Sequence, residues 1–381
     1  MTTKSPSPPD RRVEEIKHIC AELSKTLDVH DPTRTLDLLE ALVPGGDPMA
    51  VSRLALQETP IGRLVGKLRR RGGEVGDRAS KLVSAWKARE TKAATRLALR
   101  QVPRQSRYAI TFGEVAILHV GGEEIGRGRR SEGFTVGDLE AIATRVNEIS
   151  SSGGGGGEEE KAVPTQAAEL VRISDRLPEA LRTVDNDAAT LVLRGGAALF
   201  GLDADALLVE QDNAVRYDTK YFDKKKAGGQ GKTLNKRARH NVVFGEVDQD
   251  HSEDYRRCTV RSFAALPHLG GLRAALPRLL GAKALGLQAE GNHYFEAASG
   301  IGFHGDAERK VVVCVSLGAP STLRYQWRLP GSSEHTLPPV DIALRHGDMY
   351  VMSEKATGFD WLSRSKVRVV HGAGASKFID K

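Results

Sequence analysis

The feature that most restricts how this chain can fold is a run of five glycines, Gly153–Gly157, between three serines and three glutamates. A glycine run has no side chains to bury and loses the most backbone entropy on ordering, so it cannot belong to a packed element. Residues 150–162 are therefore predicted to be a flexible linker that separates domains. The length of 381 residues also favours two or three domains over one.

The first hundred residues have helical periodicity. Apolar side chains recur at three- and four-residue spacing in four segments between Val13 and Ala88, with glycine and proline breaks between the segments. Residues 12–98 are therefore predicted to form an all-α helical bundle. Residues 1–11 are polar and rich in proline, which predicts a disordered tail.

The rest of the chain is different. Residues 107–149 combine strand-like runs with a helix after Thr135, which predicts a small α/β segment of unknown role. After the linker, apolar spacing predicts helices over 162–173 and 203–211. From about residue 217 onward, short apolar runs alternate with glycine, proline and charged residues, a pattern typical of a sandwich, jelly roll or barrel.

Composition indicates which binding partners and which cellular compartment to expect. The net charge of +7 favours a polyanionic partner without requiring one. The chain has only three cysteines, and they are widely spaced, which argues against both a disulfide framework and a zinc ribbon. No apolar stretch approaches the roughly 18 to 20 residues of a membrane span, and the polar N-terminus does not read as a secretory signal. We therefore expect an intracellular protein without a membrane partner.

The sequence His304-Gly305-Asp306 is a candidate metal motif. In an extended strand, residues i and i+2 point to the same side, so an imidazole and a carboxylate placed in this way can hold one metal ion. A strand-like segment leads much later to His371, which can complete a 2-His-1-carboxylate triad with open positions for further ligands. A lone His-x-Asp pair is weak support, because about one is expected by chance in a chain with 11 histidines.

The helical segment resembles the N-terminal (LW) domain of the transcription elongation factor TFIIS. The resemblance implies docking to nuclear transcription proteins without catalysis. It is carried by Leu38, Leu39, Leu42, Leu54, Leu56, Thr59, Ile61, Gly62, Val65, Leu68, Ala79, Leu82, Val83, Trp86 and Lys87.

The C-terminal half resembles the AlkB-like branch of the 2-oxoglutarate- and iron-dependent oxygenases, and most closely those of giant viruses and algae. The resemblance implies that residues 163–381 form a double-stranded β-helix (a jelly-roll, cupin-like core) with flanking helices. It also implies Fe(II), 2-oxoglutarate and O2 as cofactors, with ascorbate as a reductant. The motifs are TLNKRARHN (233–241), GNHY (291–294), GIGFHGDAERK (300–310), YQW (325–327), HGDMYVMSEKATGFDW (346–361) and VHGAG (370–374).

By this resemblance, His304, Asp306 and His371 are the metal ligands and catalytic residues, and Asn292 and Tyr294 bind 2-oxoglutarate. The family usually anchors the far carboxylate with an arginine beyond the second histidine, and no arginine follows His371. Lys377 is the favoured substitute. The alternatives left open are Lys381, Arg368 and Arg324.

Two further features of this half of the chain can be interpreted either as part of the site or as purely structural. A second His-Gly-Asp, at His346–Asp348, is interpreted as a turn before a strand and not as a second metal site. Arg309 and Lys310 follow the metal carboxylate directly. They can orient that carboxylate or face solvent, and the sequence does not decide between these roles.

Residues 220–241 combine eight lysines and arginines with two aromatic side chains around a glycine-rich centre. Such a segment can neutralise phosphates and stack on an extruded base, although a solvated basic loop has the same composition. The first hypothesis is therefore a nuclear dioxygenase that oxidises methylated or alkylated nucleic-acid bases. The alternatives are a hydroxylase of a nuclear protein partner and a non-catalytic transcription-associated docking protein. The candidate substrate-binding residues are Lys220, Tyr221, Lys232, Lys236, Arg237 and Arg239.

Overall fold

The computed structural model describes residues 8–117, 124–126, 132–152, 167–331 and 337–380. The chain divides into two compact units, Met1–Leu97 and Ala98–Lys381. Each unit has its own hydrophobic core. Among the described residues, no helix has the length and apolar character needed to cross a bilayer.

The first unit is all-α, as the periodicity predicts. Its core gathers the apolar faces of all five helices, and the Trp86 indole is 4% exposed and donates its Nε1 proton to the Pro48 carbonyl. Leu54, by contrast, is 41% exposed and lies outside this core. The helices are α1 (Pro8–Val29), α2 (Pro32–Leu42), α3 (Arg53–Glu58), α4 (Ile61–Leu68) and α5 (Gly73–Leu99). The predicted disordered tail is too long, because α1 already begins at Pro8; residues 1–7 lie outside the described part.

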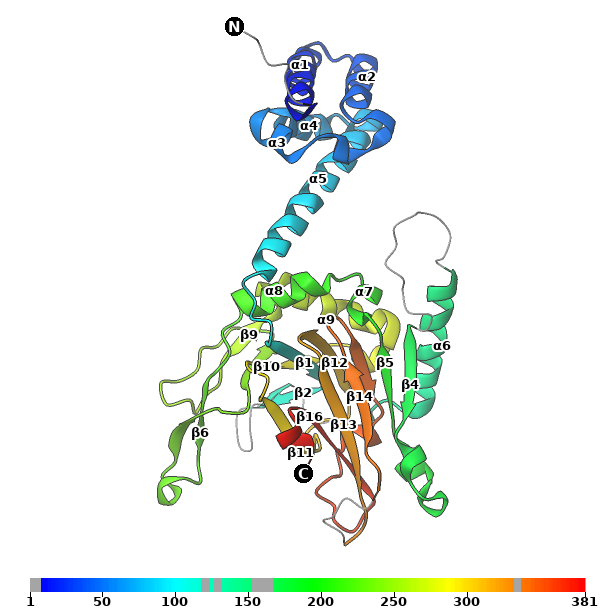
Figure 1. The fold of residues 1–381 in the computed structure, drawn as a ribbon, viewed down its shortest axis with the longest axis vertical. Helices are drawn as coiled ribbons and strands as arrows, with labels where there is room; N and C mark the ends of the chain where they lie inside the picture. The colour runs from blue at the N-terminus through cyan, green and yellow to red at the C-terminus, as the bar shows by residue number, and fades with distance from the viewer. Residues whose placement is uncertain (1–7, 118–123, 127–131, 153–166, 332–336, 381) are drawn as a thin grey trace. The chain divides into compact units, whose positions relative to one another are not determined.

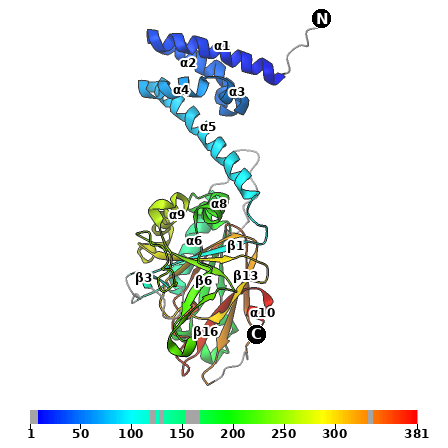
Figure 2. The same cartoon turned by 90° about the vertical axis from the view of Figure 1, so that its left-hand side faces the viewer.

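The second unit contains two antiparallel sheets that face each other (Figures 1 and 2). The larger sheet has the order β4 (Ala168–Arg172), β5 (Ala189–Leu193), β15 (Met349–Met352), β12 (Val312–Gly318), β1 (Arg107–Gly113), β10 (Gln288–Tyr294), β8 (His240–Gly245) and β9 (Val260–Ser262). The smaller sheet has the order β11 (Gly300–His304), β16 (Arg368–Gly374), β13 (Ser321–Arg328) and β14 (Val340–Leu344). Only β8 and β9 run parallel among these pairs.

The remaining elements cover or extend the two sheets. Helices α6 (Val136–Ser152), α8 (Ala204–Ala214) and α9 (Pro267–Leu280) pack on the outer face of the larger sheet, and their leucines complete its core. A second core, centred on Tyr325 and Trp327, fills the space between the sheets. Two hairpins extend the unit, β2 (Val115–Ile117) with β3 (Glu124–Gly126) and β6 (Lys220–Asp223) with β7 (Lys232–Asn235), and two short helices, α7 (Gly196–Leu199) and α10 (Ser376–Ile379), complete it.

The glycine run does not separate the two compact units. Strand β1 pairs with β10 on one side and with β12 on the other, so the predicted α/β segment 107–149 is built into the middle of the larger sheet. The predicted domain boundary at residues 150–162 is therefore wrong, because the described residues on both sides of the run belong to the second unit. The run itself, from residue 153, lies outside the described part. The predicted helix over 162–173 is also wrong in its second half, since residues 168–172 pair with β5 as an edge strand.

From β10 onward the chain crosses repeatedly between the two sheets. β10, β12 and β15 belong to the larger sheet, and β11, β13, β14 and β16 belong to the smaller one. If this alternation continued, the strand after β16 would belong to the larger sheet. In that sheet, however, the position between β10 and β12 is filled by β1, which comes from the other end of the unit.

Candidate metal centre and pocket

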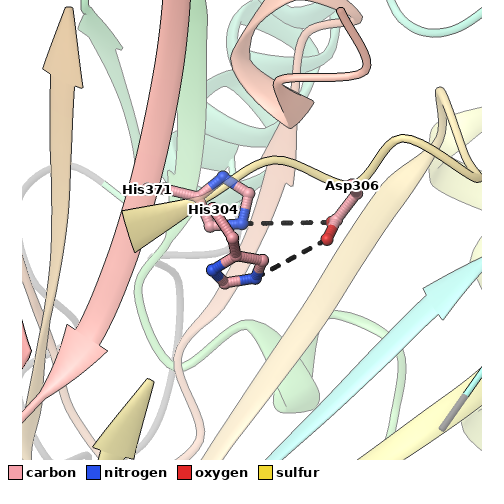
Figure 3. A group of neighbouring side chains, drawn as sticks. All are labelled: His304, Asp306 and His371. Carbon is pink, nitrogen blue, oxygen red and sulfur yellow. Dashed lines mark ion pairs between the residues drawn. The ribbon is translucent and has the colours of Figure 1, made fainter. Parts of the chain in front are cut away.

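His304, Asp306 and His371 converge between the two sheets (Figure 3). The Nε2 atom of His304 lies 3.8 Å from Asp306 Oδ1, and the Nε2 atom of His371 lies 4.0 Å from Oδ2 of the same carboxylate. The three ligand atoms all lie within 4.8 Å of one another. Metal–ligand bonds of about 2.1 Å can span such separations, so the three groups can surround one ion. No second cluster of this kind occurs in the described ranges.

The strand register brings the two histidines together. His304 ends β11 and is paired directly with His371 of β16, and their ring centroids are 4.6 Å apart. Asp306 is not on the strand, as the i, i+2 argument expects, but in the turn that follows it, where its backbone N–H donates to the Thr357 carbonyl. The glycine between them is required by packing: a side chain at Gly305 would collide with the Gly358 carbonyl oxygen and with the Trp361 indole.

The two imidazoles are prepared for ligation in different ways. The Nδ1 atom of His304 lies 2.8 Å from the Gly302 carbonyl, which can only accept, so Nδ1 is the donor and Nε2 is the nitrogen that faces the carboxylate. His371 is buried, and burial together with the neighbouring His304 holds the pKa of His371 well below its usual range. A neutral imidazole is the form that binds a metal ion.

A polar network supports the Asp306 carboxylate. Arg309 is only 3% exposed, so it does not face solvent. Its Nε lies 3.9 Å from Asp306 Oδ2, and its Nη2 donates to Glu290 Oε2 at 3.2 Å and to Glu308 Oε1 at 2.7 Å. Of the two roles left open by the sequence, the orienting role fits Arg309. Lys310 instead pairs with Glu354 and does not line the pocket.

The triad lies in a pocket of about 670 Å³, a size typical of small-molecule sites. Asn292 and Tyr294 line it from β10, as expected. The Asn292 side-chain oxygen accepts from Arg239 Nε at 2.6 Å and from Asn241 Nδ2 at 2.5 Å, which fixes the amide orientation. Tyr294 is buried, and burial raises the pKa of its hydroxyl, so the phenol remains a hydrogen-bond donor.

Arg107 was not identified from the sequence. Along β1, Tyr108, Ile110 and Phe112 enter the core beneath the helices, whereas Arg107 and the alternate positions line the pocket. The Arg107 guanidinium is nine-tenths buried and lies 5.1 Å from the centre of the Tyr294 ring. Its Nη2 donates to the Ser299 carbonyl at 2.8 Å.

The Arg107 guanidinium lacks a counter-anion among the described residues. Its Nε is buried with no hydrogen-bond partner there, and burial lowers its pKa. Leaving a charged donor buried and unpaired is costly, so an anionic ligand in the pocket would stabilise this side chain. The sequence contains one indication of this role, because Arg107 is a charged residue at the start of an apolar strand. The strands that pair with it lie almost two hundred residues further on, so the sequence alone does not show what surrounds it.

Lys377 does not meet the prediction made for it. It is exposed on α10, outside the pocket lining, and its Nζ lies 5.2 Å from the Phe378 ring. Arg324 is engaged by Asp341 and Asp380. Arg368 does not line the pocket either, and Lys381 lies outside the described residues.

The second His-Gly-Asp is structural, as predicted. Asp348 accepts from Arg194 Nη1 and from the Gly195 backbone N–H, both at 2.9 Å. His346 accepts at Nδ1 from the Gly318 N–H, and its Nε2 lies 3.0 Å from Asp205. These contacts tie a turn to its neighbours and occupy both the His346 ring nitrogens and the Asp348 carboxylate.

The predicted substrate residues are distributed over the β6–β7 hairpin and the chain that follows it. Lys220, Lys232 and Arg237 are exposed, and Tyr221 is half-buried. Arg239 lines the pocket. Lys236 departs from the prediction, because it is 9% exposed and burial lowers its pKa to about 8. Lys236 is therefore poorly placed to meet a phosphate chain in solvent.

Comparison with known proteins gives two matches. Residues 36–89 match the family model "Med26: TFIIS helical bundle-like domain", which agrees with the expected relationship of the helical unit. The chain is also 31% identical over 271 residues to "Uncharacterized protein R156" of Acanthamoeba polyphaga mimivirus, a match that covers 71% of this chain and 96% of the viral protein. The chain therefore carries a TFIIS-type helical domain and belongs to the same family as this mimivirus protein.

Proposed function

We propose that the second unit is an Fe(II)- and 2-oxoglutarate-dependent dioxygenase that oxidises methylated or alkylated bases of nucleic acid. The observation that carries the proposal is the opening of the histidine–aspartate–histidine triad into the same pocket as a buried arginine without a counter-anion. Such a triad would bind a metal ion, and such an arginine would bind one end of a small dianion.

The donor set suits iron(II). Two imidazoles and one carboxylate, with open positions beside them, are typical of non-haem iron oxygenases and untypical of structural zinc sites. When bound, the iron and 2-oxoglutarate would supply the oxidation of a substrate C–H bond by O2. The protein would contribute ligand orientation through Gly302 and Arg309, and a buried, neutral His371.

The pocket also suits the cosubstrate, whose two carboxylates lie at opposite ends. One end would approach the metal, and Arg107 would bind the other through its guanidinium fork. Tyr294 lies beside this arginine, and Asn292 lies on the same strand as Tyr294. Both side chains would donate hydrogen bonds to the same molecule. We therefore assign to Arg107 the role that the sequence suggested for Lys377.

The topology supports a double-stranded β-helix in which one strand is supplied out of order. Seven consecutive strands, β10 to β16, distribute themselves between two facing sheets. The eighth position, beside β10 and β12, is taken by β1. In this interpretation the chain has the closed jelly-roll core expected for the oxygenase family, with its cosubstrate strand before the metal motif and not after it.

A nucleic-acid substrate is favoured by charge. The β6–β7 hairpin carries exposed lysines, and Arg239, which follows β7 in the chain, reaches the pocket itself. A polyanion on these lysines would present one extruded unit to the metal centre. The TFIIS-type domain supports docking to transcription proteins, and hence a nuclear location.

The proposal is tested by 2-oxoglutarate turnover. The purified full chain with iron(II) and ascorbate should form succinate, and a methylated oligonucleotide should increase the rate. His304→Ala should remove this activity. His346→Ala is the matched control, because it changes the histidine of the second His-Gly-Asp, which is tied to Asp205 and Gly318. Equal silence of the wild type and His304→Ala, together with no binding of metal or 2-oxoglutarate, would refute catalysis and favour a docking protein.

A further inference from the structure

Three carboxylates surround the buried guanidinium of Arg309, but they do not hold it equally. Glu308 Oε1 accepts from Arg309 Nε at 3.0 Å and from Nη2 at 2.7 Å, and Glu290 Oε2 accepts from Nη2 at 3.2 Å. Asp306 Oδ2 lies 3.9 Å from Arg309 Nε, a separation too long for a hydrogen bond. The guanidinium charge therefore lies beside the Asp306 carboxylate without occupying its oxygens.

The backbone keeps Arg309 close to Asp306. The Arg309 N–H donates to the Asp306 carbonyl at 3.2 Å, so the two residues close one turn. The Arg309 stem passes β1, where a side chain at Gly113 would collide with its Cδ. The Nη1 atom of Arg309 is buried with no hydrogen-bond partner among the described residues. A buried donor without a partner is costly, so these N–H groups would turn to Asp306 unless another contact held the guanidinium in place.

Glu290 supplies that contact from the sheet. It is 7% exposed and lines the pocket from β10, and its other oxygen, Oε1, accepts from Asn241 Nδ2 at 3.2 Å. Asn241 is 1% exposed and also donates to Asn292, so β8 and β10 together fix the Glu290 carboxylate. Glu308, by contrast, is the chain neighbour of Arg309, and its side chain is 24% exposed. Glu290 is therefore the anchor of the guanidinium that is built into the larger sheet.

We propose that Glu290 is a positioning residue of the metal centre, which holds Arg309 beside Asp306 and prevents the guanidinium from closing onto that carboxylate. This inference rests on the proposed function, because it requires that the triad binds a metal ion. Without the Glu290 carboxylate, Arg309 would form a direct charge-assisted pair with Asp306. That pair would compete with the metal ion for the same oxygens, so Glu290 acts on metal affinity through Arg309.

The test is a double-mutant cycle in manganese(II) affinity, measured by titration of the full chain without 2-oxoglutarate. Glu290→Gln removes the charge that anchors Arg309 but keeps an oxygen that can accept from Asn241, so the Asn241–Asn292 contact is retained. The same substitution is then made in the Arg309→Met background, where no guanidinium can close onto Asp306.

We expect Glu290→Gln to raise the Kd for manganese(II) about 10- to 100-fold, the range typical of groups that orient a metal ligand. In the Arg309→Met background, the same substitution should change this Kd by no more than about twofold, because its effect passes through Arg309. An equal loss in both backgrounds would overturn the inference, since the Glu290 charge would then act on the metal ion directly. Wild-type affinity in Glu290→Gln would overturn it as well.

A matched control separates this role from the loss of any buried carboxylate. Glu210 is 8% exposed, lies outside the pocket lining, and accepts from the His268 and Leu269 N–H groups at the start of α9. Glu210→Gln should lower the melting temperature and keep the wild-type Kd for manganese(II). A similar loss of metal affinity in Glu210→Gln and Glu290→Gln would overturn the positioning role.

Two further results keep the inference decidable. If Arg309→Met did not fold, a crystal structure of metal-free Glu290→Gln would replace the cycle: Arg309 within hydrogen-bond distance of Asp306 would support the inference, and Arg309 in its present position would overturn it. If the wild type bound no manganese(II), the proposed function and this inference would fall together. Metal binding by the wild type with equal losses in both backgrounds would overturn the inference alone.

Discussion

Replacing Arg107 by methionine tests the assignment of the cosubstrate anchor. Methionine keeps an unbranched side chain of similar length against Tyr294 and Ser299 but removes the charge. The folded protein should not lose much stability, because the guanidinium already has a buried Nε without a partner. The effect should therefore appear in 2-oxoglutarate affinity.

The magnitude follows from the contacts that the guanidinium could make. A bidentate arginine–carboxylate pair consists of two charge-assisted hydrogen bonds, and each contributes about 1.5–3 kcal/mol. The loss of both costs at least about 3 kcal/mol, which raises Kd roughly 150-fold. The same substitution should leave metal affinity nearly unchanged, because Arg107 makes no contact with the three ligands.

Calorimetric titration of the manganese-loaded protein with 2-oxoglutarate measures this effect without turnover. Lys377→Ala is the control, since this exposed lysine lies outside the pocket and should bind the cosubstrate as the wild type does. Wild-type affinity in Arg107→Met, or a large loss in Lys377→Ala, would refute the assignment. A thermal denaturation curve of each variant would show whether any loss of affinity reflects unfolding.

Three further predictions follow from other parts of the structure. Gly305→Ala should reduce metal affinity and lower the unfolding free energy by about 1–3 kcal/mol, because the new methyl group collides with the Gly358 carbonyl and Trp361; unchanged metal titration and denaturation curves would contradict this. Burial lowers the pKa of His293 in the folded protein to about 4, below the ordinary value of 6.5 that it has in the unfolded chain. The unfolded state therefore binds a proton at a higher pH than the folded state does, and stability should fall as pH drops from about 6.5 towards 4. His293→Gln should flatten this acid branch in denaturation measured across that pH range, and an unchanged pH profile would count against the argument. Trp86→Ala should cost the helical unit about 3–5 kcal/mol while 2-oxoglutarate binding is retained, because the indole belongs to the core of the first unit alone; parallel loss of both in melting and titration experiments would argue otherwise.

Local patterns predicted the parts of the structure that depend on local contacts. The helical bundle followed from periodicity, and Thr135 caps α6 as predicted, accepting from the Asp138 N–H at 3.0 Å. The proximity of His304, Asp306 and His371 was also predicted, although the carboxylate lies in a turn and not on the strand. Residues 168–172 were assigned to a helix because an apolar run this short fits both periods, and only pairing with β5 decides between them.

The errors at the site have one common cause. The search for the carboxylate anchor considered only the end of the chain, between Arg324 and Lys381, and the glycine run was taken as a domain boundary. Both steps assumed that residues close in a domain are close in sequence. The pairing of β1 with β10 and β12 violates this assumption, and no local pattern around Arg107 reports strands so far along the chain.

The position of β1 also has a consequence for biosynthesis. Arg107 and the Ser299 carbonyl that it contacts are 192 residues apart, so a ribosome exposes β1 long before either neighbouring strand exists. At about 5–20 residues per second, this strand would wait roughly ten to forty seconds with both edges unpaired. The helical unit can fold at once from local contacts, whereas the sheet must close last around its earliest strand. We therefore expect nascent chains of this protein to depend on chaperones that hold an exposed apolar strand, more than those of a jelly roll whose strands are made in order.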